Sequence, residues 1–182
     1  IGRALAPWPA CRPVARQTLH ALGYSIVRSA ADAGVLPHFA RDAVRTDGGE
    51  RQLFFTAREY ARRQQLLSPA ELDALDEQAV LNYIGGCKGN LQYADLRAAG
   101  LPKAALRTAR QAEPPPDQPH VLTFDKIYER VRSERGWLTF DDMLLLAWEA
   151  FQRAPAVLAE WQRRYDAVLV DEFQDVNLAQ AE

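Results

Sequence analysis

A short apolar run that ends in carboxylates constrains the fold of this 182-residue chain most. Ala167–Val170 is rich in β-branched residues and too short for a buried helix, so it predicts a parallel strand covered on both faces. Asp171, Glu172 and Asp175 follow at its carboxyl end, where open α/β sheets bind their ligands. These carboxylates repel one another unless a cation or a bound group offsets their charge.

Two interpretations of this stretch stay open on its own residues. An Asp at such a strand end can hold Mg²⁺ while the adjacent Glu points at the water that attacks a nucleoside triphosphate. The alternative is a solvated acidic loop after a core strand, which is the more common arrangement for a run of this kind. Other segments of the chain must decide between them.

Composition limits the classes of protein. A hydrophobic content of 48% is enough for a substantial core, whereas a net charge of −2 and a pI near 6.0 give no general nucleic-acid signature. Cys11 and Cys87 lack metal-ligand spacing and indicate idle thiols in a reducing cytoplasm. No run is long enough to span a bilayer and no signal-peptide order is present, so we expect a cytoplasmic protein with no membrane partner.

The first residues predict a strand that leads into a helix. Ile1–Ala6 resembles the last turns of a helix, and Val14–Gln17 is a candidate strand. Thr18 then caps a helix that runs to about residue 34. Thr18 and His20 therefore sit at a strand-to-helix junction, where a hydroxyl, an imidazole and free backbone N–H groups can hold a phosphate. The alternative is a capping Thr beside a structural His.

The middle of the chain predicts basic and capped helices. Phe54–Leu67 is helix-like, and the arginines in and beside it either track a sugar–phosphate backbone or form a solvated face. Ser68 and Glu71 predict a capping box, which opens a helix that we expect to stop at Gly85-Gly86. The arginines in and beside Phe54–Leu67 are Arg51, Arg58, Arg62 and Arg63.

The segment after this helix resembles a phosphate-binding loop only superficially. Gly85–Asn90 holds glycines and Lys88, but a helix precedes it and no hydroxyl follows the lysine, so it is not a P-loop. We expect a turn that exposes Lys88 to solvent or to a nucleic-acid phosphate. Leu91–Arg110 is predicted to be helical in parts, and the proline-rich stretch 111–119 is the clearest internal boundary.

Three further helices are predicted after the prolines. The first covers Leu122–Arg135, the second is capped by Thr139, and the third runs from Pro155 to Arg164. Asp141 and Asp142 fall in the first turn of the second helix, where its dipole favours anions. The predicted buried stripe of that helix is Phe140, Met143, Leu144, Ala147, Trp148 and Phe151.

Three segments together carry a family resemblance. They are Thr18–Gly23, Leu138–Leu144 and Val170–Asn177 with Gln180, read as Thr-Leu-His-Ala-Leu-Gly, Leu-Thr-Phe-Asp-Asp-Met-Leu and Val-Asp-Glu-Phe-Gln-Asp-Val-Asn. In sequence, order and spacing they resemble the UvrD/Rep/PcrA family of superfamily 1 DNA helicases. The resemblance is close at both ends of the chain and vague from Val35 to Arg110.

The resemblance implies a role for each motif residue. Asp171 would coordinate the Mg²⁺ of Mg-ATP, Glu172 would orient and deprotonate the attacking water, and Asp175 would support that loop. Gln174 would couple the γ-phosphate site to the DNA site. Thr18 and His20 would contact single-stranded DNA. Lys88 would at most correspond to a lysine near duplex DNA.

The resemblance also implies a fold and a division of the chain. The fold class is α/β, predominantly helical here, as part of a RecA-like P-loop NTPase sheet with an inserted α-helical subdomain. Residues 1–27 would belong to the RecA-like domain, 28–119 to the inserted subdomain, and 120–182 to the return into the RecA-like domain, which ends after the Walker B strand.

Parts of the family pattern are absent from these residues. No Gly-x-x-x-x-Gly-Lys-[Ser/Thr] occurs in the chain, so we expect the P-loop upstream and a second RecA-like domain downstream. The chain then carries half of an ATP site and is expected to be inactive alone.

Three functions remain open for the parent protein. The first is an ATP-dependent, 3′-to-5′ DNA helicase or translocase that acts in DNA repair, recombination or phage defence, on single-stranded and duplex DNA and with repair or recombination proteins. The second is a non-catalytic DNA- or protein-binding module. The third is one component of a helicase–nuclease.

Overall fold

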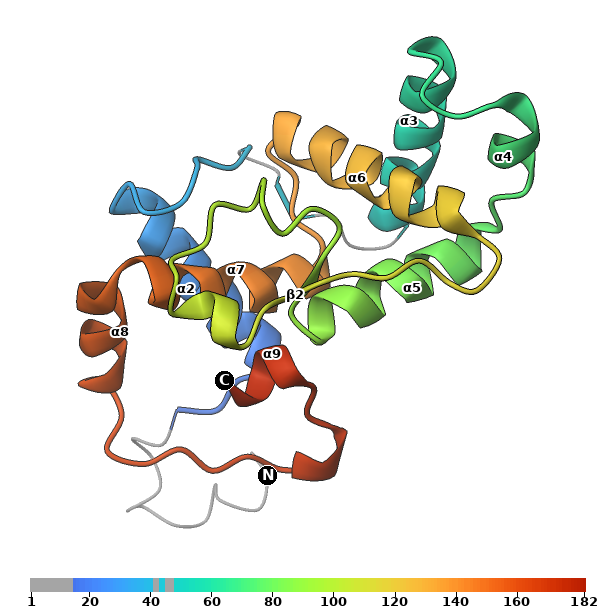
Figure 1. The fold of residues 1–182 in the computed structure, drawn as a ribbon. Coiled ribbons are helices and arrows are strands. Elements are labelled where there is room, and N and C mark those ends of the chain that lie inside the picture. Colours follow the sequence, from blue (N-terminus) through green and yellow to red (C-terminus); the bar gives the residue numbers. More distant parts are fainter. Residues whose placement is uncertain (1–14, 41–42, 45–47) are drawn as a thin grey trace.

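The computed structural model describes residues 15–40, 43–44 and 48–182, and most of them lie in helices (Figure 1). The expected helix end at Ile1–Ala6, Cys11 and Val14 fall outside these residues. The elements are α2 (Leu19–Asp32), α3 (Gly49–Arg63), α4 (Pro69–Asp73), α5 (Glu77–Gly89), β1 (Gln92–Tyr93), the 3-10 helix η2 (Ala105–Arg107), β2 (Arg110–Gln111), α6 (Pro119–Glu134), α7 (Phe140–Arg153), α8 (Pro155–Gln162), the 3-10 helix η3 (Phe173–Asp175) and α9 (Leu178–Ala181).

Side-chain caps fix where several helices begin. Thr18 accepts a hydrogen bond from the amide of Ala21, and Ser68 and Thr139 each form a capping box with the residue three positions on. These predicted helix starts are confirmed. Asn177 also forms a capping box, with Gln180, at the start of α9.

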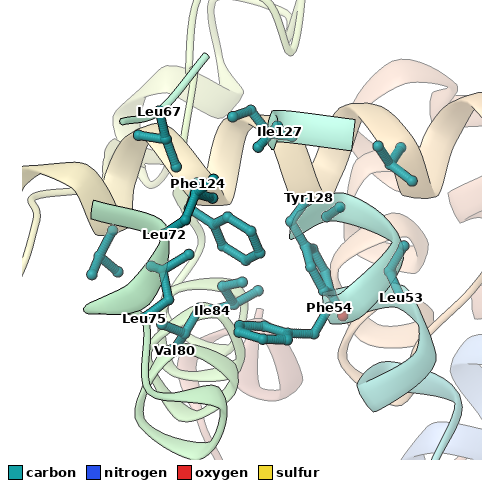
Figure 2. Packing of buried hydrophobic residues seen from close by; sticks show 14 of the residues in the cluster. Leu53, Phe54, Leu67, Leu72, Leu75, Val80, Ile84, Phe124, Ile127 and Tyr128 are labelled. Atoms are coloured by element: carbon teal, nitrogen blue, oxygen red, sulfur yellow. The ribbon is translucent and has the colours of Figure 1, made fainter. Parts of the chain in front are cut away.

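The apolar residues gather in three clusters. The α3–α6 cluster packs Phe54 of α3 against Phe124 of α6, with ring centroids 5.1 Å apart, and includes Val80 and Ile84 of α5 (Figure 2). The α2–α7 cluster joins the faces of these two helices to Val157 and Trp161 of α8. The Leu91 cluster joins Leu91, Tyr93, Ala105, Ala109, Leu144, Leu145, Trp148 and Ala179.

Close backbone contact between α2 and α7 explains the glycine at position 23. A Cβ there would lie 2.6 Å from the carbonyl oxygen of Met143, which is closer than real Cβ contacts. His20 and Phe140, near the starts of the two helices, also meet edge to face. Helix α7 also contacts α5, so it packs between α2 and α5.

The helix predicted after Ser68 differs from the observed structure. It is divided into α4 and α5, because Asp76 caps a new helix through the amide of Ala79. Gly85 and Gly86 do not end α5, which continues to Gly89. Glycine lowers helix propensity by about 1 kcal/mol, and packing on α7 overrides that preference here.

The predicted helical content of Leu91–Arg110 was largely wrong. Only the short 3-10 helix η2 forms there, and β1 and β2 pair in parallel across the loop between them. The Gln111 side chain donates to the carbonyls of Tyr93 and Ala94, at 3.0 and 2.9 Å, and so closes this loop. In the part of the chain that the structure describes, β1–β2 is the one sheet of named strands, so the full sheet of an α/β fold is not seen.

Candidate functional site

The acidic segment Asp171–Asp175 is exposed, and the run before it is not a strand. Val168 and Leu169 expose 66% and 97% of their surface, so the prediction of a strand covered on both faces was wrong for this structure. A strand must pair its backbone with a neighbour, and β1 and β2 pair only with each other within the described residues. Strong β propensity in Ala167–Val170 is therefore not enough to form a strand.

A single turn shapes the acidic segment. Glu172 adopts a left-handed conformation with φ of 51°, and its carbonyl accepts a hydrogen bond of 2.9 Å from the amide of Asp175. The Glu172 amide lies 3.1 Å from the Asp171 carboxylate, to which it donates. The side chain of Gln174 donates to the Glu172 carboxylate. The two residues with predicted catalytic roles, Glu172 and Gln174, are therefore in direct contact.

The donor atoms of this segment suit Mg²⁺, which protein sites bind through one or two carboxylates together with substrate phosphates. Asp171 and Asp175 supply such oxygens and are open to solvent. Among the residues that the structure describes, no three His, Cys, Asp or Glu side chains converge on a metal position. The acidic segment is thus compatible with one side of a Mg-nucleotide site and does not form a whole one.

Thr18 and His20 lie at the start of α2. Thr18 is exposed, and its hydroxyl accepts from the Ala21 amide at 3.1 Å, as a capping Thr does. His20 is half-buried, and its ring meets that of Phe140 edge to face at 5.7 Å. Phe140 is 45% exposed and was wrongly predicted as part of the buried stripe, because the first residue of α7 lies at the end of its packed face.

One hydrophobic cluster joins the start of α2 to α9, the helix that follows the acidic segment. Leu19, between Thr18 and His20, packs on the Leu91 cluster, which also contains Ala179 of α9. Gln17 donates to the hydroxyl of Tyr165 at 3.3 Å, so the residues before α2 also lie beside the chain that leads to the acidic segment. No contact joins Thr18 or His20 directly to Asp171–Asp175 among the interactions of the described residues.

The arginine-bearing helix α3 does not present a free basic track. Arg58 pairs with Asp73 at 3.1 Å and Arg51 with Glu77 at 3.3 Å. Arg62 and Arg63 both pair with Glu59, and these hydrogen bonds lower the pKa of its carboxyl to about 2. Of the two interpretations of this segment, the ion pairs favour a solvated face.

Lys88 is buried, which overturns the expectation of an exposed turn. Only 4% of the residue is accessible, and its ammonium lies 2.7 Å from both Asp142 of α7 and Glu129 of α6. Burial alone would lower the pKa of Lys88, but these carboxylates raise it above its usual value. A lysine in this position cannot reach a nucleic-acid phosphate while the helices stay packed.

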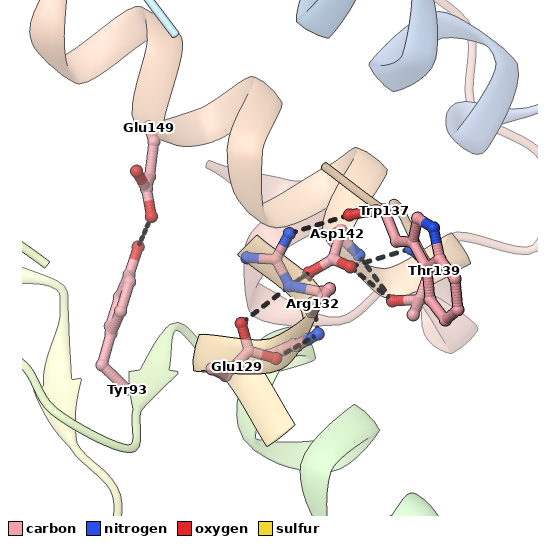
Figure 3. A network of polar contacts seen from close by, with 8 residues as sticks. Tyr93, Glu129, Arg132, Trp137, Thr139, Asp142 and Glu149 are labelled. Atoms are coloured by element: carbon pink, nitrogen blue, oxygen red, sulfur yellow. Dashed lines mark hydrogen bonds and ion pairs between the residues drawn. The ribbon is translucent and has the colours of Figure 1, made fainter. Parts of the chain in front are cut away.

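Arg132 completes a buried network around Asp142 (Figure 3). Its guanidinium lies 2.9 Å from Glu129 and 3.4 Å from Asp142, and it donates to the carbonyl of Trp137 at 3.1 Å. Burial raises the pKa of Asp142, but Arg132 and Lys88 outweigh it and lower that pKa. The carboxylate also accepts from the amide and the hydroxyl of Thr139, both at 2.8 Å.

The sequence predicted only a helix-dipole role for Asp142 and did not reveal this network. The capping-box spacing from Thr139 was the available signal for Asp142. Nothing in the local sequence connects Lys88 to a residue 54 positions later.

Within the described ranges no helix has the length and apolar character needed to cross a membrane.

Comparisons with known proteins agree with the resemblance carried by the three motifs. The family model for the UvrD/REP helicase N-terminal domain matches residues 3–182. An ATP-dependent DNA helicase PcrA of Leuconostoc citreum is 26% identical over 97% of this chain and 21% of that protein. A PcrA of Staphylococcus epidermidis is 35% identical over 43% of the chain and 11% of that protein.

A third relative has a different activity in its name. It is one of the subunits of an ATP-dependent helicase/nuclease of Natranaerobius thermophilus, and it is 38% identical over 33% of this chain and 5% of that protein. The chain thus spans about a fifth or less of the length of these relatives. The comparison with solved structures gives no significant match. Because the family model covers almost all of its residues, the chain belongs to the UvrD/REP helicase N-terminal domain family.

Proposed function

We propose that this chain is the part of an ATP-dependent DNA helicase that carries the Walker B segment and a contact for single-stranded DNA. The observation that carries the proposal is the family match over residues 3–182, which includes both the Thr18–His20 segment and the acidic segment. The exposure of Thr18 and of the acidic segment supports it, because a ligand can reach both.

In this proposal each residue has the role that the resemblance implies. Asp171 holds Mg²⁺, with Asp175 supporting the segment, and Glu172 orients the attacking water. Gln174, which already donates to Glu172, links the phosphate side to the DNA side. Bound Mg-ATP supplies the phosphoryl group whose transfer drives translocation. The division into RecA-like residues 1–27, an inserted helical subdomain at 28–119 and RecA-like residues 120–182 is also part of the proposal.

The proposed DNA contact consists of Thr18, His20 and the neighbouring ring of Phe140. An exposed aromatic ring can stack on a base, and single-strand binders use such rings with little sequence preference. The free amides at the start of α2 add a favourable position for a phosphate. The chain is net acidic, so we expect its binding to be weak and strongly dependent on salt, with Kd around 10⁻⁴–10⁻⁶ M.

Steady-state ATP turnover tests the proposal. The complete gene product is expected to hydrolyse ATP faster with single-stranded DNA, and Glu172→Gln is expected to abolish that turnover. Glu160→Gln, which changes an exposed glutamate of α8, is the matched control. The 182-residue chain alone is expected to show none. The proposal fails if the complete product lacks DNA-stimulated hydrolysis, or if Glu172→Gln leaves the rate unchanged.

The match to a helicase/nuclease favours a second candidate, in which the complete gene product also cleaves DNA. Incubation of that product with linear DNA, Mg²⁺ and ATP distinguishes the two. Release of short fragments that persists in Glu172→Gln would indicate a separate nuclease site. Unwinding without cleavage would indicate the helicase alone.

A further inference from the structure

The end of α5 lies against the helix that follows the acidic segment. If Gly89 carried a Cβ, this atom would lie 2.8 Å from Nδ2 and 3.3 Å from Cγ of Asn177. Asn177 comes two residues after Asp175, and its side chain caps α9. Gly89 is therefore required for this close approach, whereas a Cβ on Gly86 of the same helix would meet nothing within 4 Å.

Asn177 cannot easily move away from Gly89. Its Oδ1 accepts from the Gln180 amide at 3.0 Å, and its own amide donates to the Gln180 side chain at 2.9 Å. One residue into α9, Ala179 is buried in the Leu91 cluster, between the end of α5 and α7. Displacing the Asn177 side chain thus disturbs the cap and the docking of α9.

The α5 side of the contact between Gly89 and Asn177 is also fixed. Lys88, the residue before Gly89, is held by the buried carboxylate of Asp142 and the partly buried carboxylate of Glu129. Further back on the same helix, Val80 and Ile84 belong to the α3–α6 cluster. Helix α5 therefore reaches without a break from that cluster to Asn177.

The acidic segment has few other supports. The hydrogen bonds recorded for Asp171–Asp175 all lie within residues 171–176. The preceding residues, 167–170, are exposed and have no regular structure. Among the described residues, the docking of α9 is thus the nearest anchor of the segment on its carboxyl side.

We propose that Gly89 and Asn177 are positioning residues, through which α5 holds the acidic segment in place relative to the α3–α6 cluster. Neither residue touches the nucleotide in this proposal. The consequence for ATP turnover rests on the proposed function, since it requires Asp171 and Glu172 to act there. The positioning itself does not depend on that function.

NMR of the 182-residue chain tests the positioning. Gly89→Ala is expected to shift the amide resonances of residues 171–181 and to lower their order parameters from the rigid value of about 0.85 towards 0.6. Gly86→Ala, on the same helix, is the matched control and is expected to leave them unchanged. Equal spectra for the two variants in this region would overturn the proposal.

A rescue variant separates positioning from general damage. Asn177→Ser keeps a capping oxygen and removes the atom nearest to Gly89, so alone it is expected to loosen residues 171–181. Combined with Gly89→Ala, it makes room for the methyl group and is expected to restore the order parameters. Failure of this rescue contradicts the proposal, and Asn177→Ser alone gives the test if Gly89→Ala does not fold.

Turnover by the complete gene product gives the functional part of the test. Gly89→Ala is expected to lower kcat on the order of 10- to 100-fold with a smaller change in KM for ATP, because small displacements of catalytic groups cost rate. The double variant is expected to recover it. If no DNA-stimulated turnover exists, the proposed function fails while the NMR result still decides the positioning. Normal kcat in a Gly89→Ala variant with altered spectra overturns the catalytic consequence alone.

Discussion

Lys88 and Asp142 lie 2.7 Å apart in the interior, with 5% and 0% of their side chains exposed, and join two helices that are distant in sequence. Glu129 and Arg132 of α6 surround the pair, so each buried charge has a partner. Such a pair is costly to break because the remaining buried ion loses part of its compensation. This relationship ties the α3–α6 cluster to α7.

We expect Lys88→Met to lower the free energy of unfolding by about 1.5–3 kcal/mol, because Asp142 and Glu129 each lose one charged partner and keep only Arg132 as a cation. Urea denaturation followed by circular dichroism measures the change. Lys103→Met, at an exposed position, serves as the control and is expected to change stability by less than about 0.5 kcal/mol. Similar midpoints for the two variants would show that the pair contributes little.

The buried carboxyl of Asp125 should make the stability of the fold depend on pH. Burial, followed by the charge of Glu129, raises the pKa of this carboxyl from 3.8 to about 7. Between about pH 4 and 7 the folded state therefore keeps a proton on Asp125 that the unfolded state loses. The contribution of Asp125 to the free energy of unfolding falls as the pH rises through this range. Lys88 partly opposes the shift, and Asp142 adds to it.

Asp125→Asn should thus be more stable than the parent above pH 7, on the order of a few kcal/mol, and similar to it near pH 4. Thermal unfolding at several pH values measures the difference. Asp166→Asn, which changes an exposed carboxylate, is the matched control. A constant difference across the range would rule out titration of Asp125 as the cause.

The contact between α2 and α7 should not accept a methyl group at Gly23. Its Cβ would lie 2.6 Å from the backbone oxygen of Met143, which cannot rotate away as a side chain can. We expect Gly23→Ala to cost about 1–3 kcal/mol of stability. Gly86→Ala, with open space around its Cβ, is expected to be neutral or up to about 1 kcal/mol more stable. Chemical denaturation of both variants decides the matter.

Phe140 and Phe55 offer a matched comparison for DNA binding, since they are 45% and 44% exposed on different parts of the molecule. We expect Phe140→Ala to weaken binding to an oligothymidylate by about 5- to 150-fold, because a stacked base contributes about 1–3 kcal/mol. Fluorescence anisotropy at low salt measures this for the 182-residue chain. Equal losses for Phe140→Ala and Phe55→Ala would remove the proposed contact.

Local signals in the sequence predicted local structure well. Thr18, Ser68 and Thr139 were identified as helix caps, because a cap depends on residues only three positions apart. The motif residues also pointed to the correct family, which the match over residues 3–182 shows. Their roles in chemistry stay predictions.

Interactions between distant residues could not be predicted in this way. The residues around Lys88 give no sign that it pairs with Asp142, 54 positions later, so Lys88 was predicted to be exposed although it is buried. Gly85 and Gly86 were taken for a helix end because their propensity is low, whereas contact with α7 keeps them helical. The run Ala167–Val170 has strand propensity, but pairing requires a neighbour that its own residues cannot supply.

The three glycines in the carboxyl half of α5 also bear on the order in which the chain folds. Gly85, Gly86 and Gly89 within five residues make a peptide of this sequence a poor helix former on its own. The carboxyl half of α5 should therefore become helical only after α7 is in place to receive it. Folding kinetics of Gly86→Ala are expected to give a φ-value near 0, so that the substitution slows unfolding rather than speeding folding.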